Sequence, residues 1–312
     1  MVWPVALAIA GALCLAVGAA VQESAASSRP DVTGFRFLAT LARDPMWLLG
    51  TVLMGIGVAA HLVALAYAPV TLIQPLGVTG LLVAVWAAAR LHRRLLTRAE
   101  IAGAAAMTVG LAALVATLPR HDAPPTDPNL TELGFLAFAL ATVLTVAALT
   151  RHRLRRAIAL AVAAGACFGV ASALIRLIAF AARNDASSVV AWPTPVALAL
   201  LVLGGALLQH SYRLGHFAVS YALLLIADPL VASLTAVSLF GEPLPVGGAA
   251  MGAAVAAAVI ASGVALLVRS VPAPREPVDQ VRGERPHSAV TDGTRRGPIS
   301  VNPPATPTKQ SI

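Results

Sequence analysis

The sequence predicts an all-α membrane protein with nine transmembrane helices. Of the 312 residues, 58% are hydrophobic and only 12% are charged, whereas a soluble protein is about one quarter charged. Apolar runs of about 20 residues recur along the chain, and that length crosses about 30 Å of hydrocarbon as a helix. This composition excludes a soluble enzyme, a DNA-binding domain and an intrinsically disordered chain.

The first half of the chain supplies four of the spans. Met1–Val21 is expected to be a span rather than a signal peptide, because no Lys or Arg precedes it and it is longer than a usual signal core. Over Gly34–Arg43 apolar residues mix with arginine, which predicts a short helix on the membrane surface. Only Tyr67-Ala68-Pro69 joins the second and third spans, so a tight turn is expected there. The four predicted spans are 2–21, 46–67, 69–90 and 99–118.

Five spans and a tail make up the second half. Arg213-Leu214-Gly215 is again too short for anything but a tight turn between the seventh and eighth spans. Residues 269–312 hold eight prolines and seven Lys or Arg residues, which predicts a disordered basic tail. The five predicted spans are 131–149, 157–181, 194–213, 215–240 and 246–268.

Positive charge predicts how the chain crosses the membrane. Apart from the tail, twelve Lys and Arg residues fall in loops on one side and two, Arg120 and Arg183, on the other. Cytoplasmic loops carry the excess of positive charge. The N-terminus is therefore expected outside and the tail in the cytoplasm, in a protein of the plasma membrane. The same rule explains the net charge of +8, so no nucleic-acid partner is expected.

An internal repeat relates spans one to four to spans six to nine. A shift of 149 residues superimposes the halves without a gap and pairs Gly55 with Gly204 and His61 with His210. Since five spans separate the partners, the second copy enters the membrane from the opposite side, an arrangement typical of alternating-access transporters. The predicted transporter domain is 1–268, with a first repeat 1–118, a connector helix 131–149 and a second repeat 157–268.

Polar groups inside apolar spans are the candidate site residues, because hydrocarbon penalises them unless they find partners or water. Asp228 is the deepest carboxylate, about 20 Å along its span, and Pro229 is expected to break the helix beside it. This pair could contact a cation, a proton or an amine. Alternatively, Asp228 caps the break or pairs with Arg176, which could also receive an anionic group or extend outward.

Further candidates lie in other spans. Gln74-Pro75 is a second expected helix break, either a substrate contact or a kink with a satisfied amide. His61 and His210 could relay protons or be ordinary hydrogen-bonded residues near the membrane surface. Gln22-Glu23 closes the first span on the inner side. The predicted substrate path is Asp228, Arg176, Gln74, His61, His210, Glu23 and Gln22; no metal site is predicted, but a cation transporter would use Asp228 and Glu23.

Neither an enzyme nor a cofactor is expected. The sequence has no His-Glu-x-x-His, no Gly-x-Ser-x-Gly and no P-loop, so it does not drive transport with ATP by itself. Cys14 and Cys167 lie in apolar runs, where cysteine behaves as a small hydrophobic residue. Glycines four apart, such as Gly165 and Gly169, allow helices to pack closely, within one bundle or in a homodimer.

One run of motifs in the second half is typical of a transporter family. Asp228-Pro229 is followed by Phe240-Gly241-Glu242-Pro243-Leu244 and by a span rich in small residues. The first half echoes this in Ala68-Pro69-Val70 and Gln74-Pro75-Leu76, although Arg93-Arg94 stands where the second half has Glu242-Pro243. The pattern over 1–268 resembles the EamA-type members of the drug/metabolite transporter superfamily.

Typical EamA members have ten spans, so nine spans with an external N-terminus are closer to the NIPA-like branch, which is associated with magnesium transport. Val21-Gln22 and Pro75-Leu76-Gly77 resemble elements of that branch. The resemblance implies secondary transport, and the leading hypothesis is a transporter of small metabolites or drug-like solutes by alternating access. The first alternative is a transporter of magnesium or another divalent cation, since magnesium needs only one or two carboxylates. The second is a membrane scaffold that transports nothing.

Overall fold

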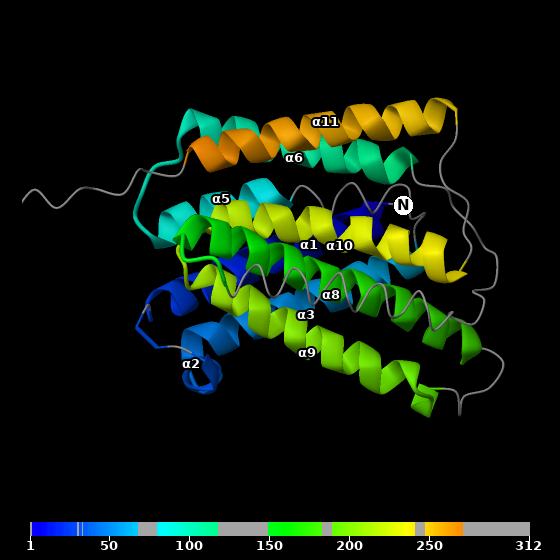
Figure 1. Cartoon of the computed structure of the whole chain (residues 1–312), viewed down its shortest axis with the longest axis horizontal. Coiled ribbons are helices and arrows are strands. Elements are labelled where there is room, and N and C mark those ends of the chain that lie inside the picture. Colours follow the sequence, from blue (N-terminus) through cyan, green and yellow to red (C-terminus); the bar gives the residue numbers. More distant parts are fainter. Residues whose placement is uncertain are drawn as a thin grey trace, which may run out of the picture. The chain divides into compact units, whose positions relative to one another are not determined.

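The computed structural model describes residues 2–29, 31–32, 34–67, 80–117, 149–182, 189–240 and 247–270. The chain divides into two compact units, Met1–Pro272 and Ala273–Ile312, and all described residues belong to the first. Within these residues the regular elements are α-helices (Figure 1). The helices are α1 Val2–Ser27, α2 Gly34–Leu41, α3 Pro45–Tyr67, α5 Gly80–Leu91, α6 Arg98–Thr117, α8 Arg153–Ala181, α9 Pro193–Tyr212, α10 Phe217–Phe240 and α11 Gly248–Arg269.

These helices confirm an all-helical membrane protein. Five of the described helices, α1, α8, α9, α10 and α11, are long and apolar enough to cross a membrane. Where a predicted span is described, its ends agree with the helix to within a few residues in most cases. The connector 131–149 (apart from its last residue) and the first part of span 69–90 lie outside the described residues.

Helix α1 is longer than predicted. It continues to Ser27, six residues beyond the expected end at Val21, and so includes Gln22 and Glu23. Polar residues suggested the end of a span, but both side chains are buried against other helices. A helix satisfies its own backbone groups, so it is the stable conformation wherever the chain stays inside the bundle.

Helices pack in pairs through glycine. Helix α1 packs on α3 and α5, α8 packs on α9 and α10, and α6 packs on α11 (Figure 1). A methyl group at Gly18 of α1 would lie 2.8 Å from the carbonyl oxygen of Gly50 in α3, and one at Gly103 of α6 would lie 2.9 Å from that of Gly263 in α11. The two helix backbones are so close at these positions that no side chain larger than the hydrogen atom of glycine fits.

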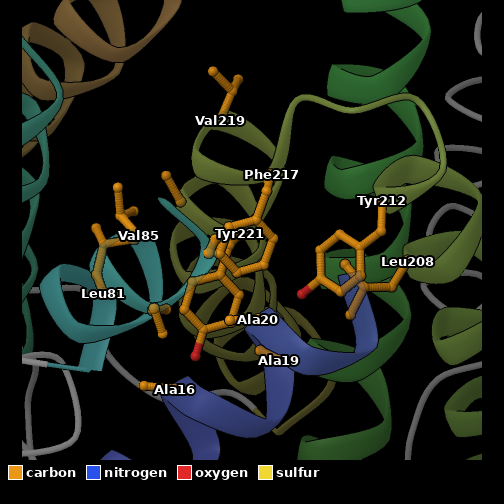
Figure 2. Packing of buried hydrophobic residues seen from close by; sticks show 14 of the residues in the cluster. Ala16, Ala19, Ala20, Leu81, Val85, Leu208, Tyr212, Phe217, Val219 and Tyr221 are labelled. Carbon is orange, nitrogen blue, oxygen red and sulfur yellow. The ribbon is translucent and has the colours of Figure 1, made fainter. Parts of the chain in front are cut away.

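The main buried cluster brings α1, α5, α9 and α10 together. Figure 2 shows Tyr212 and Tyr221 beside the turn of α1 that carries Ala19 and Ala20. The Phe217 ring stacks on Tyr221 with their centroids 5.4 Å apart, and it contacts Tyr212 at 5.2 Å. Small alanines on α1 thus make space for large aromatic rings from α9 and α10, which fixes the position of the next turn of α1.

The expected short amphipathic helix is present as α2, and one of its faces is fixed to the bundle. Phe37 is completely buried, with its ring 5.1 Å from the His210 ring and 5.2 Å from the Arg213 guanidinium. Arg29 and Asp44 form an ion pair across the ends of the segment that contains α2. Asp44 also accepts the backbone N–H of Trp47 at 2.9 Å, which lowers the pKa of its carboxyl and caps α3.

Two phenylalanines of α2 provide a matched test of this packing. Phe37→Ala is expected to lower the free energy of unfolding in detergent by about 3–5 kcal/mol, because it removes a fully buried ring. Phe35→Ala is expected to change it by less than about 0.5 kcal/mol, because Phe35 is 84% exposed. Thermal or denaturant unfolding of the two variants measures both values, and equal effects would contradict the placement of α2.

Candidate functional site

A chain of hydrogen-bonded polar side chains, in which Gln22 and Gln209 are buried and Thr51 is exposed, links three helices at the end of α1. Gln209 Nε2 of α9 donates to Gln22 Oε1 at 2.9 Å, and Gln22 Nε2 donates to Thr51 Oγ1 of α3 at 2.9 Å. Thr51 Oγ1 in turn donates to the carbonyl oxygen of Trp47 at 2.9 Å. The chain therefore connects α9 in the second half of the sequence to α1 and α3 in the first half.

Glu23 lies next to this chain and is 2% exposed. Its Oε2 is 2.8 Å from Nε2 of His92, which follows the end of α5 and whose side chain is 38% exposed. A buried carboxylate is stable only when it is paired or hydrogen-bonded, and here its partner is a titratable imidazole rather than a permanently charged arginine. A neutral imidazole can still donate a hydrogen bond, but it no longer balances the negative charge of the carboxylate.

Two more oxygen atoms near this end of α1 have no hydrogen-bond partner among the described residues. They are the Tyr212 hydroxyl, which is buried beside α1 (Figure 2), and Gln209 Oε1. Together with Glu23 they provide carboxylate, amide and hydroxyl oxygens; hard cations bind carboxylate and amide oxygens directly, and a hydroxyl oxygen can accept a hydrogen bond from coordinated water. In the described part of the chain no three His, Cys, Asp or Glu side chains come together as a metal site, so a cation here would keep some of its waters.

His92 and Glu23 make the stability depend on pH. The hydrogen bond to the Glu23 carboxylate raises the pKa of His92 above its usual value of 6.5, and burial opposes this only in part. Because the pKa of His92 is higher in the folded protein than in the unfolded chain, protonated His92 stabilises the fold fully at pH values below its unfolded pKa. This contribution to stability is lost as the pH rises through the pKa of the folded protein. The ion pair is therefore complete in mild acid and weakens towards alkaline pH.

The substitution His92→Gln tests this dependence. The difference in thermal midpoint between the wild type and the variant is expected to be largest in mild acid and to shrink as the pH rises above 6.5. Thermal unfolding at a series of pH values measures it. A difference that is constant or that increases with pH would contradict the ion pair.

Asp228 lies on α10 where this helix packs closely on α8. A methyl group at Gly169 would be 2.5 Å from the carbonyl oxygen of Asp228, and one at Gly165 would be 3.1 Å from its backbone nitrogen. The helix break expected at Pro229 is absent, because α10 continues through this residue to Phe240. Proline removes only one backbone donor, a loss that a well-packed membrane helix tolerates.

The other described path residues, His61, Arg176 and His210, lie on three different helices. His61 of α3 is partly buried and its Nδ1 has no partner in the described part of the chain, whereas His210 Nδ1 lies 2.8 Å from the Ala206 carbonyl oxygen. Arg176 is exposed on α8. Gln74 and Pro75 lie outside the described residues.

Two residues of this polar chain and its neighbourhood, Gln209 and His92, are not among the candidates predicted from the sequence. Gln209 is a buried amide inside a predicted span, so the criterion that selected Gln22 also applies to it. His92 lies in a loop, and no local pattern marks it. Its pairing with Glu23, 69 residues away, is visible only in three dimensions.

Comparison with known proteins identifies the family. The family model described as "Magnesium transporter NIPA" matches residues 3–182. The chain is 29% identical over 135 residues to the probable magnesium transporter NIPA6 of Arabidopsis thaliana, covering 42% of this chain but only 40% of that protein. It is 26% identical over 276 residues to the uncharacterized protein Cgl0250/cg0304 of Corynebacterium glutamicum, covering 86% of this chain and 92% of that protein. No solved structure matches the chain.

The matched segment includes α1, α3, α5 and α6 and ends at the last turn of α8. It therefore contains Gln22, Glu23, Thr51 and His92, whereas Gln209 lies beyond it. The match covers more than half of the chain and confirms the resemblance to the NIPA-like branch of the drug/metabolite transporter superfamily. The protein belongs to the NIPA magnesium transporter family.

Proposed function

We propose that this protein transports magnesium, or another divalent cation, across the membrane along a path that passes Glu23. The observation that carries the proposal is a carboxylate buried to 2% exposure whose hydrogen-bonding partner is His92. Membership of the NIPA family favours the divalent-cation hypothesis over the more general one of a small-solute transporter.

The chemistry around Glu23 suits a partly hydrated magnesium ion. Magnesium accepts oxygen ligands, keeps several waters and is usually held by one or two carboxylates. Glu23 would supply the charge, and the free oxygens of Gln209 and Tyr212 would accept hydrogen bonds from coordinated water. In the absence of the ion, protonated His92 would balance the carboxylate.

Asp228 is proposed as a second contact along the path. It is a partly buried carboxylate on α10, on the turn that faces Gly165 and Gly169 of α8. An acidic side chain inside a membrane helix is a candidate ion contact by default, because hydrocarbon penalises it otherwise. Two carboxylates on different helices would allow the ion to pass from one to the other.

Alternating access is the proposed mechanism, and the pairing of helices supports it. In the predicted repeat, α1, α3, α5 and α6 of the first half correspond to α8, α9, α10 and α11 of the second half. The contacts of α1 with α3 and α5 then correspond to those of α8 with α9 and α10, and the contact between α6 and α11 joins a corresponding pair. All these contacts exist, which is what a two-fold relation between inverted repeats requires. With the expected orientation, the end of α1 that holds Glu23 faces the cytoplasm.

A test of the function is stabilisation of the purified protein by magnesium. Magnesium chloride is expected to raise the free energy of unfolding by about 2.7 kcal/mol at a hundred times its dissociation constant. Choline chloride at the same ionic strength is the control. Stabilisation by organic amines or amino acids but not by magnesium would favour the small-solute transporter, and no stabilisation by either would favour the scaffold.

A further inference from the structure

A cluster of cationic side chains lies where α9 ends beside the beginning of α8. Ser211 Oγ donates to the carbonyl oxygen of Ala157 at 2.8 Å, which holds the end of α9 against the first turns of α8. Arg213 lies two residues after Ser211, in the turn to α10, and Arg153 and Arg156 lie four and one residues before Ala157. Three guanidinium groups therefore come from two segments about 60 residues apart.

Arg213 is the buried member of this cluster and is 8% exposed. One of its terminal nitrogens donates to the carbonyl oxygen of Val32, and its guanidinium lies 5.2 Å from the centre of the Phe37 ring. Its Nε has no hydrogen-bond partner among the described residues. A buried donor without an acceptor is unfavourable. A bound ligand that offered an acceptor to this nitrogen would therefore be stabilised.

The positive charges of the cluster act on one another. Burial and, after it, the charges of Arg156 and Arg153 lower the pKa of Arg213. Burial and then Arg153 lower the pKa of His216 in the same turn. An anion bound between these groups would reduce this repulsion.

The described carboxylates do not provide that anion. The ion pairs in the described ranges join Arg29 to Asp44, Arg94 to Glu100 and Glu23 to His92. None of these pairs includes an arginine of the cluster. Asp31, next to Val32, is exposed and forms no ion pair with the cluster within those ranges.

The first turn of α8 adds backbone donors to the same place. The residue before this helix, His152, makes no side-chain capping hydrogen bond, so the first N–H groups of α8 are not capped by it. Free N–H groups at the start of a helix attract anions, and phosphate groups above all. Arginine adds a planar fork of donors that matches phosphate oxygens.

From these contacts we infer that Arg153, Arg156 and Arg213 form a binding site for a phosphate group. The group is either the headgroup of an anionic lipid or a soluble phosphate. Basic pockets at the cytoplasmic ends of membrane helices are suited to anionic headgroups, and the expected orientation puts this end of α8 and α9 in the cytoplasm. The Arg213 side chain is held in place by Val32 and Phe37 and contacts the phosphate from the buried side of the site. The exposed Arg153 and Arg156 contact it from the solvent side.

The test uses the full-length protein in phosphatidylcholine nanodiscs, with Arg153→Gln/Arg156→Gln as the site variant. Arg93→Gln/Arg98→Gln is the matched control, because it removes the same charge from two exposed arginines at the α5–α6 turn. The probes are phosphatidic acid added to the nanodiscs and, separately, inorganic phosphate in the buffer. The readout is the thermal midpoint relative to phosphatidylcholine alone.

Phosphatidic acid is expected to raise the midpoint of the wild type and of the control, and the site variant is expected to lose at least half of that increase. A response to phosphatidic acid alone identifies a lipid headgroup, and an equal response to inorganic phosphate identifies a soluble ligand. In phosphatidylcholine alone, the site variant is expected to be at least as stable as the wild type, since the repulsion is relieved. An increase that survives in the site variant, or that falls equally in the control, would overturn the proposal.

Discussion

Replacing Glu23 by glutamine is expected to reduce magnesium transport by about ten- to a hundredfold. Glutamine fills the same space and can still accept a hydrogen bond from His92, but it has no charge to attract the ion. A hydrogen bond to a charged group contributes about 1.5–3 kcal/mol, and every 1.4 kcal/mol is a factor of about ten in affinity. Flux into proteoliposomes measures the loss, with the amount of folded protein determined by size-exclusion chromatography.

Glu100→Gln is the matched control for this substitution. Glu100 is also a buried glutamate, 5% exposed, but it pairs with Arg94 at 2.8 Å and accepts the backbone N–H of Thr97 at 2.9 Å at the start of α6. Its replacement is expected to weaken this cap and leave flux per folded molecule unchanged. Equal flux losses in the two variants would show that a buried glutamate matters only for folding.

The second large effect is expected at the crossing of α8 and α10. Gly169→Ala places a methyl group 2.5 Å from the carbonyl oxygen of Asp228 and 2.8 Å from the backbone nitrogen of Ala232. Backbone atoms cannot rotate away, so the helices must separate, and overpacking of this kind costs about 1–3 kcal/mol of stability. The separation also moves the turn that carries Asp228, so flux should fall together with the thermal midpoint.

Gly205→Ala provides the comparison, because a methyl group there would meet no described atom within 4 Å. Alanine is a better helix former than glycine by about 0.8–1.0 kcal/mol, so the thermal midpoint should stay the same or rise. Equal stability of the two glycine variants would contradict the close packing of α8 on α10 at Gly169.

Hydrophobic patterning explains why most helices could be predicted from the sequence. The ends of α3, α6 and α11 agree with the predicted spans to within two residues, since charged or turn-forming residues flank each apolar run. Helix α1 ran past its predicted end because the polar Gln22 and Glu23 are buried by other helices. Periodicity along one segment carries no information about such distant partners.

The same limit applies to the candidate site. Gln22 and Glu23 were selected by their position in the sequence, but their partners Gln209 and His92 lie 187 and 69 residues away. Pro229 suggested a break because proline is usually disruptive inside a helix, yet α10 continues through it. Local rules therefore identified polar residues in apolar spans, whereas tertiary packing determines which of them meet.

The most direct test of a cation path at Glu23 is magnesium flux into liposomes that contain the purified protein and a trapped magnesium indicator. For the wild type, the predicted result is a saturable flux that is absent from protein-free liposomes and that Glu23→Gln reduces about ten- to a hundredfold. Folded wild-type protein that moves no more magnesium than empty liposomes would contradict the account, and so would a Glu23→Gln variant that transports as fast as the wild type.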